Sequence, residues 1–265
     1  MSQEKIPSEG KCIFCGEMFS STRISRHLQE HLNKNVKLSL KEKSYLVKVE
    51  EDPRWRKSSP YFLYLWVDKT LFMGGIDALL RGIWLECCGH MSRFSYPQGN
   101  KRNKMLEQAL IERIITKGLD NWDEGWSEEA IDEDISMDAE AGNILHKGLK
   151  LRYEYDFGSS TYLVLNVIKE YPIEVKERLV LLSRNEPLEL LCHCCKTEPA
   201  TQICTVHGWN EESIFCDTCA KKHAKKCPDF KEYAALPVVN SPRMGVCSYN
   251  GGLLDQERDG VFVKK

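Results

Sequence analysis

The spacing of cysteine and histidine residues constrains this chain more than any other feature. Twelve of its 265 residues are cysteine, and most of them lie near the N-terminus or between residues 192 and 227. The polar start of the chain shows no secretory signal pattern, so we expect a cytoplasmic protein whose thiols stay reduced. Paired cysteines in such a compartment bind metal more often than they form disulfides. The pattern therefore predicts two metal-binding modules that flank a larger domain.

The first module is a short pattern of two cysteines and two histidines. Cys12 and Cys15 are separated by two residues and His27 and His31 by three, with eleven residues between the pairs. Four nitrogen and sulfur ligands suit a tetrahedral structural zinc ion, and histidines four positions apart share one face of a helix. Residues 11–32 thus resemble the C2H2 zinc-finger family, in which the spacer usually has twelve residues.

The same family resemblance suggests what the finger helix contacts. In DNA-reading fingers three helix positions face the bases, and counting back from His27 places Ser20, Arg23 and Arg26 at them. Arginine pairs readily with guanine, so the module is a candidate DNA- or RNA-binding site. A single finger covers only about three base pairs, however, so a structural role or a protein contact is the alternative.

The region between the two modules, residues 44–187, alternates strand-like and helix-like segments. Aromatic and β-branched runs indicate strands, and apolar residues at helical spacing indicate helices. A turn signal at residues 158–160 indicates an antiparallel hairpin. We expect strands over 61–70, 149–157, 161–171 and 177–185, and helices over 71–88 and 104–117. These elements predict an α+β fold with a mixed or mainly antiparallel sheet.

Two runs in this middle region resemble the plasmid pRiA4b ORF-3-like family. They are IDALLRGIWLECCGHMSRF and LRYEYDFGSSTYLVLNVI, and the likeness extends over roughly residues 44–185. The run VVNSPRMGVCSYNGG is similar to a tail found with some of these proteins. The resemblance implies a compact α+β sheet domain in a mobile-element or defence setting, with no settled activity. Family members commonly carry Asp, Trp and a nearby His after the Tyr-Asp-Phe-Gly turn, whereas this chain has Ser159, Ser160 and Thr161.

Four residues of the middle region are candidates for catalysis. Cys87, Cys88 and His90 form a Cys-Cys-Gly-His sequence that suits a nucleophile with its base, or half of a metal site. Asp156 lies in the hairpin turn. The alternative is structural: the cysteines end a buried helix, His90 satisfies a turn, and Asp156 holds its turn through backbone hydrogen bonds. No phosphate-binding loop, nucleophile elbow or zinc-protease motif occurs, so we favour a protein without enzymatic activity.

The second module holds eight regularly spaced ligands between residues 188 and 230. Eight ligands suffice for two tetrahedral zinc ions, and the even spacing resembles the cross-brace of B-box domains, in which alternate pairs share a metal. That pairing gives one site of Cys192, Cys195, Cys216 and Cys219, and another of Cys204, His207, His223 and Cys227. His193 and Cys194 make the first pair ambiguous. With the finger, the chain is predicted to bind about three zinc ions.

Charge is distributed unevenly along a chain whose formal net charge is -2. Lys221, Lys222, Lys225 and Lys226 surround a predicted ligand, and they form either a phosphate contact or the solvated face of a helix. Residues 118–146 contain ten acidic residues and no lysine or arginine. We interpret them as a solvated loop with a short helix, or as a surface for a basic partner.

The sequence therefore predicts five parts. They are a zinc finger (1–32), a linker (33–43), an α+β domain (44–187), a two-zinc module (188–230) and a tail (231–265). The first functional hypothesis is a non-enzymatic protein that binds DNA or RNA. The alternatives are a protein-interaction scaffold with purely structural zinc ions, and an enzyme that uses the region of Cys87, Cys88, His90 and Asp156. No apolar stretch approaches the roughly 18 residues of a membrane-spanning helix, so no membrane partner is expected.

Overall fold

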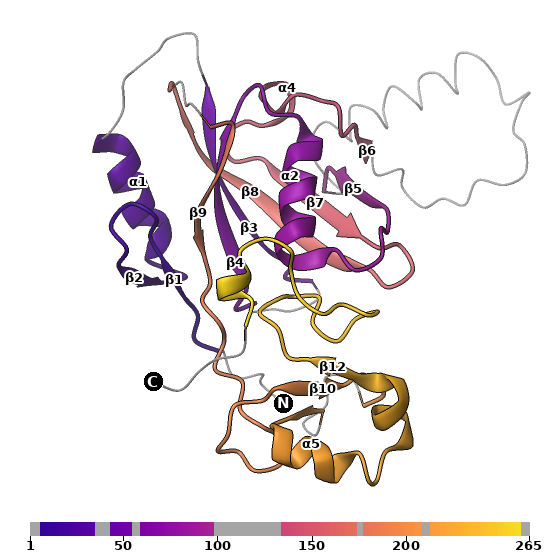
Figure 1. Ribbon diagram of the computed structural model, residues 1–265. Coiled ribbons are helices and arrows are strands. Elements are labelled where there is room, and N and C mark those ends of the chain that lie inside the picture. The colour runs from indigo at the N-terminus through magenta and orange to yellow at the C-terminus, as the bar shows by residue number, and fades with distance from the viewer. Residues whose placement is uncertain are drawn as a thin grey trace, which may run out of the picture.

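A seven-stranded sheet forms the centre of the protein (Figure 1). The computed structural model describes residues 6–34, 43–54, 59–97, 134–173, 177–207 and 213–260. Its strands are β1 (Glu9–Lys11), β2 (Met18–Ser20), β3 (Ser44–Glu51), β4 (Phe62–Asp68), β5 (Ser92–Ser95), β6 (Asp134–Ile135), β7 (Lys150–Tyr155), β8 (Thr161–Tyr171), β9 (Leu179–Arg184), β10 (Gln202–Cys204), β11 (Ile214–Phe215) and β12 (Ala235–Pro237). Its helices are α1 (Ile24–Lys34), α2 (Met73–Leu80), α4 (Ala141–Ile144), α5 (Asp217–His223), the π-helical turns η1 (Arg81–Leu85) and η2 (Phe230–Ala234), and the 3-10 turn η3 (Gln256–Arg258).

The central sheet has the strand order β6-β5-β7-β8-β3-β4-β9, and each pair of neighbours is antiparallel. The predicted hairpin is present as β7 and β8, and the runs predicted at 61–70 and 177–185 form β4 and β9. The prediction of an α+β fold with a mainly antiparallel sheet is therefore confirmed. Strand β3, which the sequence patterns did not single out, lies between β8 and β4.

Strand β4 is buried on both faces, which explains its continuous apolar sequence. Leu63, Leu65 and Val67 point into the larger core, which includes the apolar residues of α2. The alternate residues Tyr64 and Trp66 point into a second core, which includes the apolar face of α1. The sheet is thus covered by α2 on one face and by the N-terminal module on the other.

The helix expected over 71–88 is shorter than predicted. Helix α2 ends at Leu80, and the next five residues form the π-helical turn η1. The carbonyl of Gly82 in this turn accepts hydrogen bonds from the backbone amides of Leu253 and Leu254, which come from the end of the chain. A Cβ at position 82 would lie 2.7 Å from a side-chain carbon of Leu254. The tail therefore approaches the helix closely at the point where α2 gives way to the π-helical turn.

The C-terminal segment runs from the module that contains α5 back to the central sheet (Figure 1). Two fully buried arginines help to hold it in place. The guanidinium of Arg184 on β9 forms ion pairs with Asp255 and Asp259, at 3.1 and 2.8 Å. The guanidinium of Arg243 donates to Asp156 in the β7–β8 turn, at 2.5 Å. The predicted tail is consequently part of the folded protein.

Three predicted segments cannot be compared with the structure in full. The helix at 104–117 lies outside the described residues, as do most of the linker 33–43 and most of the acidic segment 118–146. Among the described residues, no helix combines the length and apolar character that a membrane crossing requires.

Candidate metal centres

The structure brings the four residues of the N-terminal pattern together. Cys12 and Cys15 lie in the loop between β1 and β2, and His27 and His31 lie on successive turns of α1. The Cys15 Sγ and His31 Nε2 atoms are 3.2 and 3.1 Å from His27 Nε2. Zinc–ligand bonds of roughly 2.0–2.3 Å place neighbouring tetrahedral ligands about 3.3–3.8 Å apart, close to these distances. The arrangement therefore fits one metal ion.

The loop that carries the two cysteines depends on one glycine. The backbone amide of Gly16 donates to the Cys12 carbonyl, at 2.8 Å, and the amide of Cys12 donates to the Glu17 carbonyl, at 2.9 Å. Gly16 has a φ of 74°, in the left-handed region that side chains disfavour. The aromatic ring of Phe19 stacks on His27 with centroids 3.8 Å apart. The Gly16 turn and the stacking of Phe19 on His27 together orient the ligand side chains toward one another.

The N-terminal module packs against the central sheet. Ile24, Leu28 and Leu32 on one face of α1 are buried against sheet residues. The backbone amide of Ile13 also donates to the Leu182 carbonyl of β9, at 3.0 Å. The apolar face of α1 therefore holds the finger against the central sheet.

The predicted base-contacting residues lie near the start of α1: Ser20 ends β2, Arg23 immediately precedes the helix, and Arg26 lies in its first turn. Arg23 and Arg26 are exposed, whereas Ser20 is only half-buried at the end of β2. No described structural feature tests whether they contact nucleic acid. Their exposure leaves them free to meet an anionic ligand.

The first cluster of the C-terminal module contains Cys192, Cys195, Cys216 and Cys219. Cys216 immediately precedes α5 and Cys219 lies in the first turn of the helix. The Sγ atoms of Cys195 and Cys216 are 4.0 Å apart. Hydrogen bonds from the Thr197 side chain and from the backbone amides of Thr197 and Glu198 lower the pKa of Cys195 to about 6. A lowered pKa favours the thiolate, which is the form in which cysteine binds metal.

The second cluster of this module contains Cys204, His207, His223 and Cys227. Cys204 Sγ lies 3.0 Å from His207 Nδ1 at the end of β10. His223 ends α5, and its ring stacks on Phe215 with centroids 4.3 Å apart. The two clusters of the module are grouped as the alternate pairing requires, although metal binding itself stays a prediction.

The structure assigns places to two residues that were ambiguous in the sequence. Cys194 is exposed and belongs to none of the clusters found among the described residues. His193 accepts a hydrogen bond from the backbone amide of Ser213 through Nδ1, at 3.2 Å. Cys192 is therefore the member of the pair that joins Cys195. All twelve cysteines are free thiols.

The four lysines beside the second cluster are exposed. Lys221 and Lys222 lie on α5, and Lys225 and Lys226 lie between His223 and Cys227. Their exposure is compatible with either a phosphate contact or a solvated face. As with the finger arginines, their predicted role stays untested.

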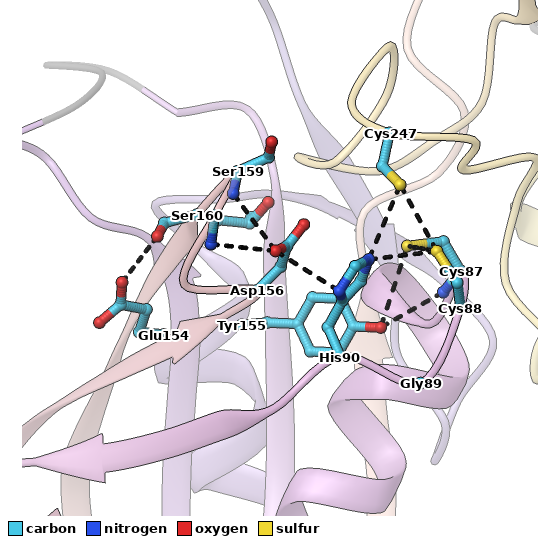
Figure 2. Close-up of polar contacts among 12 residues, drawn as sticks. Cys87, Cys88, Gly89, His90, Glu154, Tyr155, Asp156, Ser159, Ser160 and Cys247 are labelled. Carbon is cyan, nitrogen blue, oxygen red and sulfur yellow. Dashed lines mark hydrogen bonds and ion pairs between the residues drawn. The ribbon is translucent and has the colours of Figure 1, made fainter.

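The candidate catalytic residues lie together, but their surroundings differ from the prediction. Both cysteines follow a buried helical turn that ends at Leu85, but Cys87 is half-buried and Cys88 is exposed, so the burial expected of them is not found. The chain leaves the π-helical turn before them, which carries Cys88 to the surface. His90 Nε2 is 3.1 Å from Cys88 Sγ, and His90 Nδ1 is 3.5 Å from Asp156 Oδ1 (Figure 2).

Asp156 has the turn-forming role expected of it and a further one. Its carboxylate accepts hydrogen bonds from the backbone amides of Gly158 and Ser159, each at 3.2 Å. Burial raises its pKa, but the hydrogen bond from Arg243 and those from the two amides outweigh burial and hold the pKa below its usual value. Asp156 is therefore an anion that faces His90.

The residue that sequence reasoning missed is Cys247. Its Sγ lies 3.5 Å from Cys88 Sγ and 3.7 Å from His90 Nε2. It comes from the C-terminal segment, 159 residues from Cys88, so no local spacing could indicate the contact. The one available signal was that Cys247 remained unassigned after the eight ligands of the second module were paired.

Comparison with known proteins adds little to this description. No family model matches the chain, and no curated protein matches it either. Among solved structures, it is similar to a protein of unknown function, MM3350, from Methanosarcina mazei Go1. The two share 13% identity over 54% of this chain and 67% of that one, with a TM-score of 0.33. The resemblance to the pRiA4b ORF-3-like family consequently stays a prediction.

Proposed function

We propose that this chain is a non-enzymatic zinc protein that binds nucleic acid. Three zinc ions would occupy the finger and the two clusters of the C-terminal module. The donor sets support this choice of metal, because thiolate and imidazole ligands in tetrahedral groups favour zinc. Each group supplies four protein ligands and leaves no open position for a substrate, as in structural zinc sites. The zinc ions would therefore maintain the fold.

The observation that carries the nucleic-acid proposal is the orientation of the finger helix. Its apolar face is buried on the sheet, whereas Arg26 in its first turn and Arg23 just before it are exposed. Among the exposed charged residues from 23 to 34, Arg23, Arg26 and Lys34 are cationic and Glu30 is anionic. The surface left to a ligand thus has a net positive charge, which suits phosphate or the edge of guanine. The exposed lysines of the C-terminal module would add phosphate contacts. The predicted mobile-element or defence setting is compatible with such a ligand.

Binding at low salt tests this proposal directly. Fluorescence anisotropy with mixed duplex and single-stranded probes should show binding that weakens steeply as salt increases. The double variant Arg23→Ala/Arg26→Ala should weaken binding about tenfold or more, because two cations leave the contact surface. The matched control Lys147→Ala/Lys150→Ala removes the same charge from exposed positions elsewhere and should change little. No binding at micromolar protein, or an unchanged arginine double variant, would refute the proposal.

A protein partner is the second candidate, because an apolar groove lies beside the finger. The groove has a volume of about 260 Å³. It is lined by Ile13, Phe14, His31, Leu32, Trp66, Ile173, Val180 and Leu182. Phe14 is 42% exposed at its edge. A groove of this composition suits the apolar side chains of a peptide segment.

Photocrosslinking distinguishes this second candidate from the first. A photoreactive phenylalanine analogue in place of Phe14 should form a defined protein adduct if a partner occupies the groove. The same analogue in place of Phe157, which is 47% exposed in the β7–β8 turn, serves as the control. Equal adducts at both positions, or none at position 14, would contradict a docking role for the groove.

A further inference from the structure

A fourth group of metal-binding side chains lies where the C-terminal segment meets the central domain. Cys87 and Cys88 follow the π-helical turn, His90 precedes β5, and Cys247 arrives from the C-terminal segment (Figure 2). One ligand atom from each of the four lies within 4.8 Å of the others. None of these residues belongs to the three zinc sites described above.

The distances within this group match those of a tetrahedral metal site. Cys88 Sγ is 3.5 Å from the Sγ atoms of both Cys87 and Cys247, and 3.1 Å from His90 Nε2. Cys247 Sγ is 3.7 Å from His90 Nε2. Neighbouring ligands of a zinc ion are about 3.3–3.8 Å apart, as the bond lengths imply. The spacing is also similar to that of the finger, where adjacent ligands are 3.1 and 3.2 Å apart.

The groups around these four residues are those that usually support a metal site. The Asp156 carboxylate faces Nδ1 of His90 and leaves Nε2 directed at the sulfur atoms. A carboxylate behind a histidine fixes the ring and its tautomer in many metal centres. The buried guanidinium of Arg243 donates to Cys87 Sγ, at 3.4 Å, and also pairs with Asp156. A positive group beside a thiol favours the thiolate that binds metal.

Two other roles explain the geometry less completely. A nucleophilic Cys88 with His90 as its base and Asp156 as orienter would leave Cys87 and Cys247 without a part. A disulfide between Cys88 and Cys247 would require the sulfur atoms to approach from 3.5 Å to about 2.05 Å, and it would leave His90 without a role. Only a metal site uses all four side chains at once.

We propose that Cys87, Cys88, His90 and Cys247 bind a fourth zinc ion. Three thiolates and one imidazole form a ligand set that suits zinc and leaves no open position. The ion joins the end of η1 to the C-terminal segment. This junction already contains a hydrogen bond from Ser241 Oγ to the Trp84 carbonyl, at 2.7 Å. The ion thereby fastens the C-terminal segment to the central domain.

The zinc content of matched cysteine variants tests the fourth site. Protein purified without chelator should contain one zinc ion fewer per chain in Cys247→Ser than in the wild type. Cys194→Ser, which removes an exposed thiol outside the clusters, should retain the wild-type content. The result is a difference of one ion, so it holds whether or not the other three sites are filled. Equal zinc content in Cys247→Ser and the wild type would overturn the proposal.

A spectroscopic measurement on the wild-type chain covers the case in which Cys247→Ser does not fold. Protein loaded with ¹¹³Cd should give four cadmium resonances, one of them at the shift of three sulfur ligands and one nitrogen. The other three sites contain two or four sulfur ligands, so this resonance is distinct. A spectrum without a three-sulfur resonance would overturn the fourth site. Rapid alkylation of Cys88 in that protein would then indicate a nucleophilic thiol.

Discussion

The N-terminal finger and the C-terminal module, called here the two ends, carry similar ligands but are stabilised in different ways. At the N-terminus, Ile24, Leu28 and Leu32 of the finger helix enter a core made largely of sheet residues. In the C-terminal module, the core around α5 has nine buried residues, and five of them are cysteines predicted as ligands. The finger thus shares the core of the sheet, whereas the α5 region relies on the ligands themselves.

This difference shows that the same zinc chemistry need not carry the same share of stability. Small zinc modules fold only with their metal because they bury too little apolar surface alone. The finger escapes that limit by packing on β4 and β9. The α5 region does not, since its aromatic residues Phe215 and Phe230 pack mainly around the ligands. Metal loss should therefore affect the two ends unequally.

The largest expected effect follows from removing one ligand at each end. Cys204→Ser should release one zinc ion and leave the site of Cys192, Cys195, Cys216 and Cys219 loaded. The segment between His223 and Cys227 should then open, because a ligand residue bounds it on each side. Trypsin should cleave this variant quickly after Lys225 and Lys226. Cys15→Ser should also lose one ion, yet trypsin should cleave slowly after Arg26, because α1 stays packed on the sheet.

Zinc analysis and mass spectrometry of the tryptic peptides measure both variants together. Cys194→Ser serves as the control for a cysteine change and should behave as the wild type. Release of two ions from Cys204→Ser would mean that the two sites of the module do not hold their metal ions independently. Equally fast cleavage of α1 and α5 in their respective variants would contradict the comparison between the two ends.

A smaller effect is expected when the contact between finger and sheet is weakened. Leu28→Ala removes a fully buried side chain from the second core and should destabilise the protein by about 2–5 kcal/mol. Denaturant unfolding measures this loss. Met18→Ala, at a 45% exposed position on the same module, should change stability by less than about 0.5 kcal/mol. An unchanged free energy of unfolding in Leu28→Ala would show that packing on the sheet does not stabilise the finger.

A still smaller loss of stability is expected from a substitution in the loop that carries the cysteine ligands of the finger. Gly16 has a φ of 74°, and a side chain in this conformation costs about 1–2 kcal/mol. Gly16→Ala should therefore lower stability by that amount while zinc remains bound, because the nearest atom to a new Cβ is 3.6 Å away. Denaturant unfolding together with zinc analysis separates strain from loss of metal. An unchanged stability would contradict the assigned turn.

The smallest effect on stability is expected from the proposed nucleic-acid contacts. Arg23→Ala/Arg26→Ala should shift the free energy of unfolding by less than about 0.5 kcal/mol, because both side chains are exposed. Thermal unfolding and zinc content should match the wild type. A large loss of stability would mean that the arginines support the fold, and their effect on binding would then carry no functional meaning.

Local sequence spacing predicted the features that depend on local geometry. The four finger ligands are closely spaced in the sequence, so one turn and α1 bring them together. The grouping of the eight C-terminal ligands into two sites followed from the resemblance to B-box domains. The hairpin of β7 and β8 followed from two β-branched runs around a short turn. These predictions needed no knowledge of distant contacts.

The features that the sequence did not reveal depend on contacts between distant segments. Cys247 joins Cys88 only after the C-terminal segment returns to the sheet. The same segment lies against the end of α2, where its backbone amides donate hydrogen bonds to the Gly82 carbonyl. Short strands such as β5 and β6 lack a pattern long enough to recognise. Tertiary packing decided each of these cases.

Hydrogen exchange with and without a zinc chelator tests the difference between the two ends most directly. Amides of α1 and α5 can be followed in the same sample, so each helix controls for the other. The account predicts that chelation removes the protection of α5 while α1 keeps most of its own, because Ile24, Leu28 and Leu32 remain buried against the sheet. Equal loss of protection in both helices, or loss in α1 alone, would contradict it.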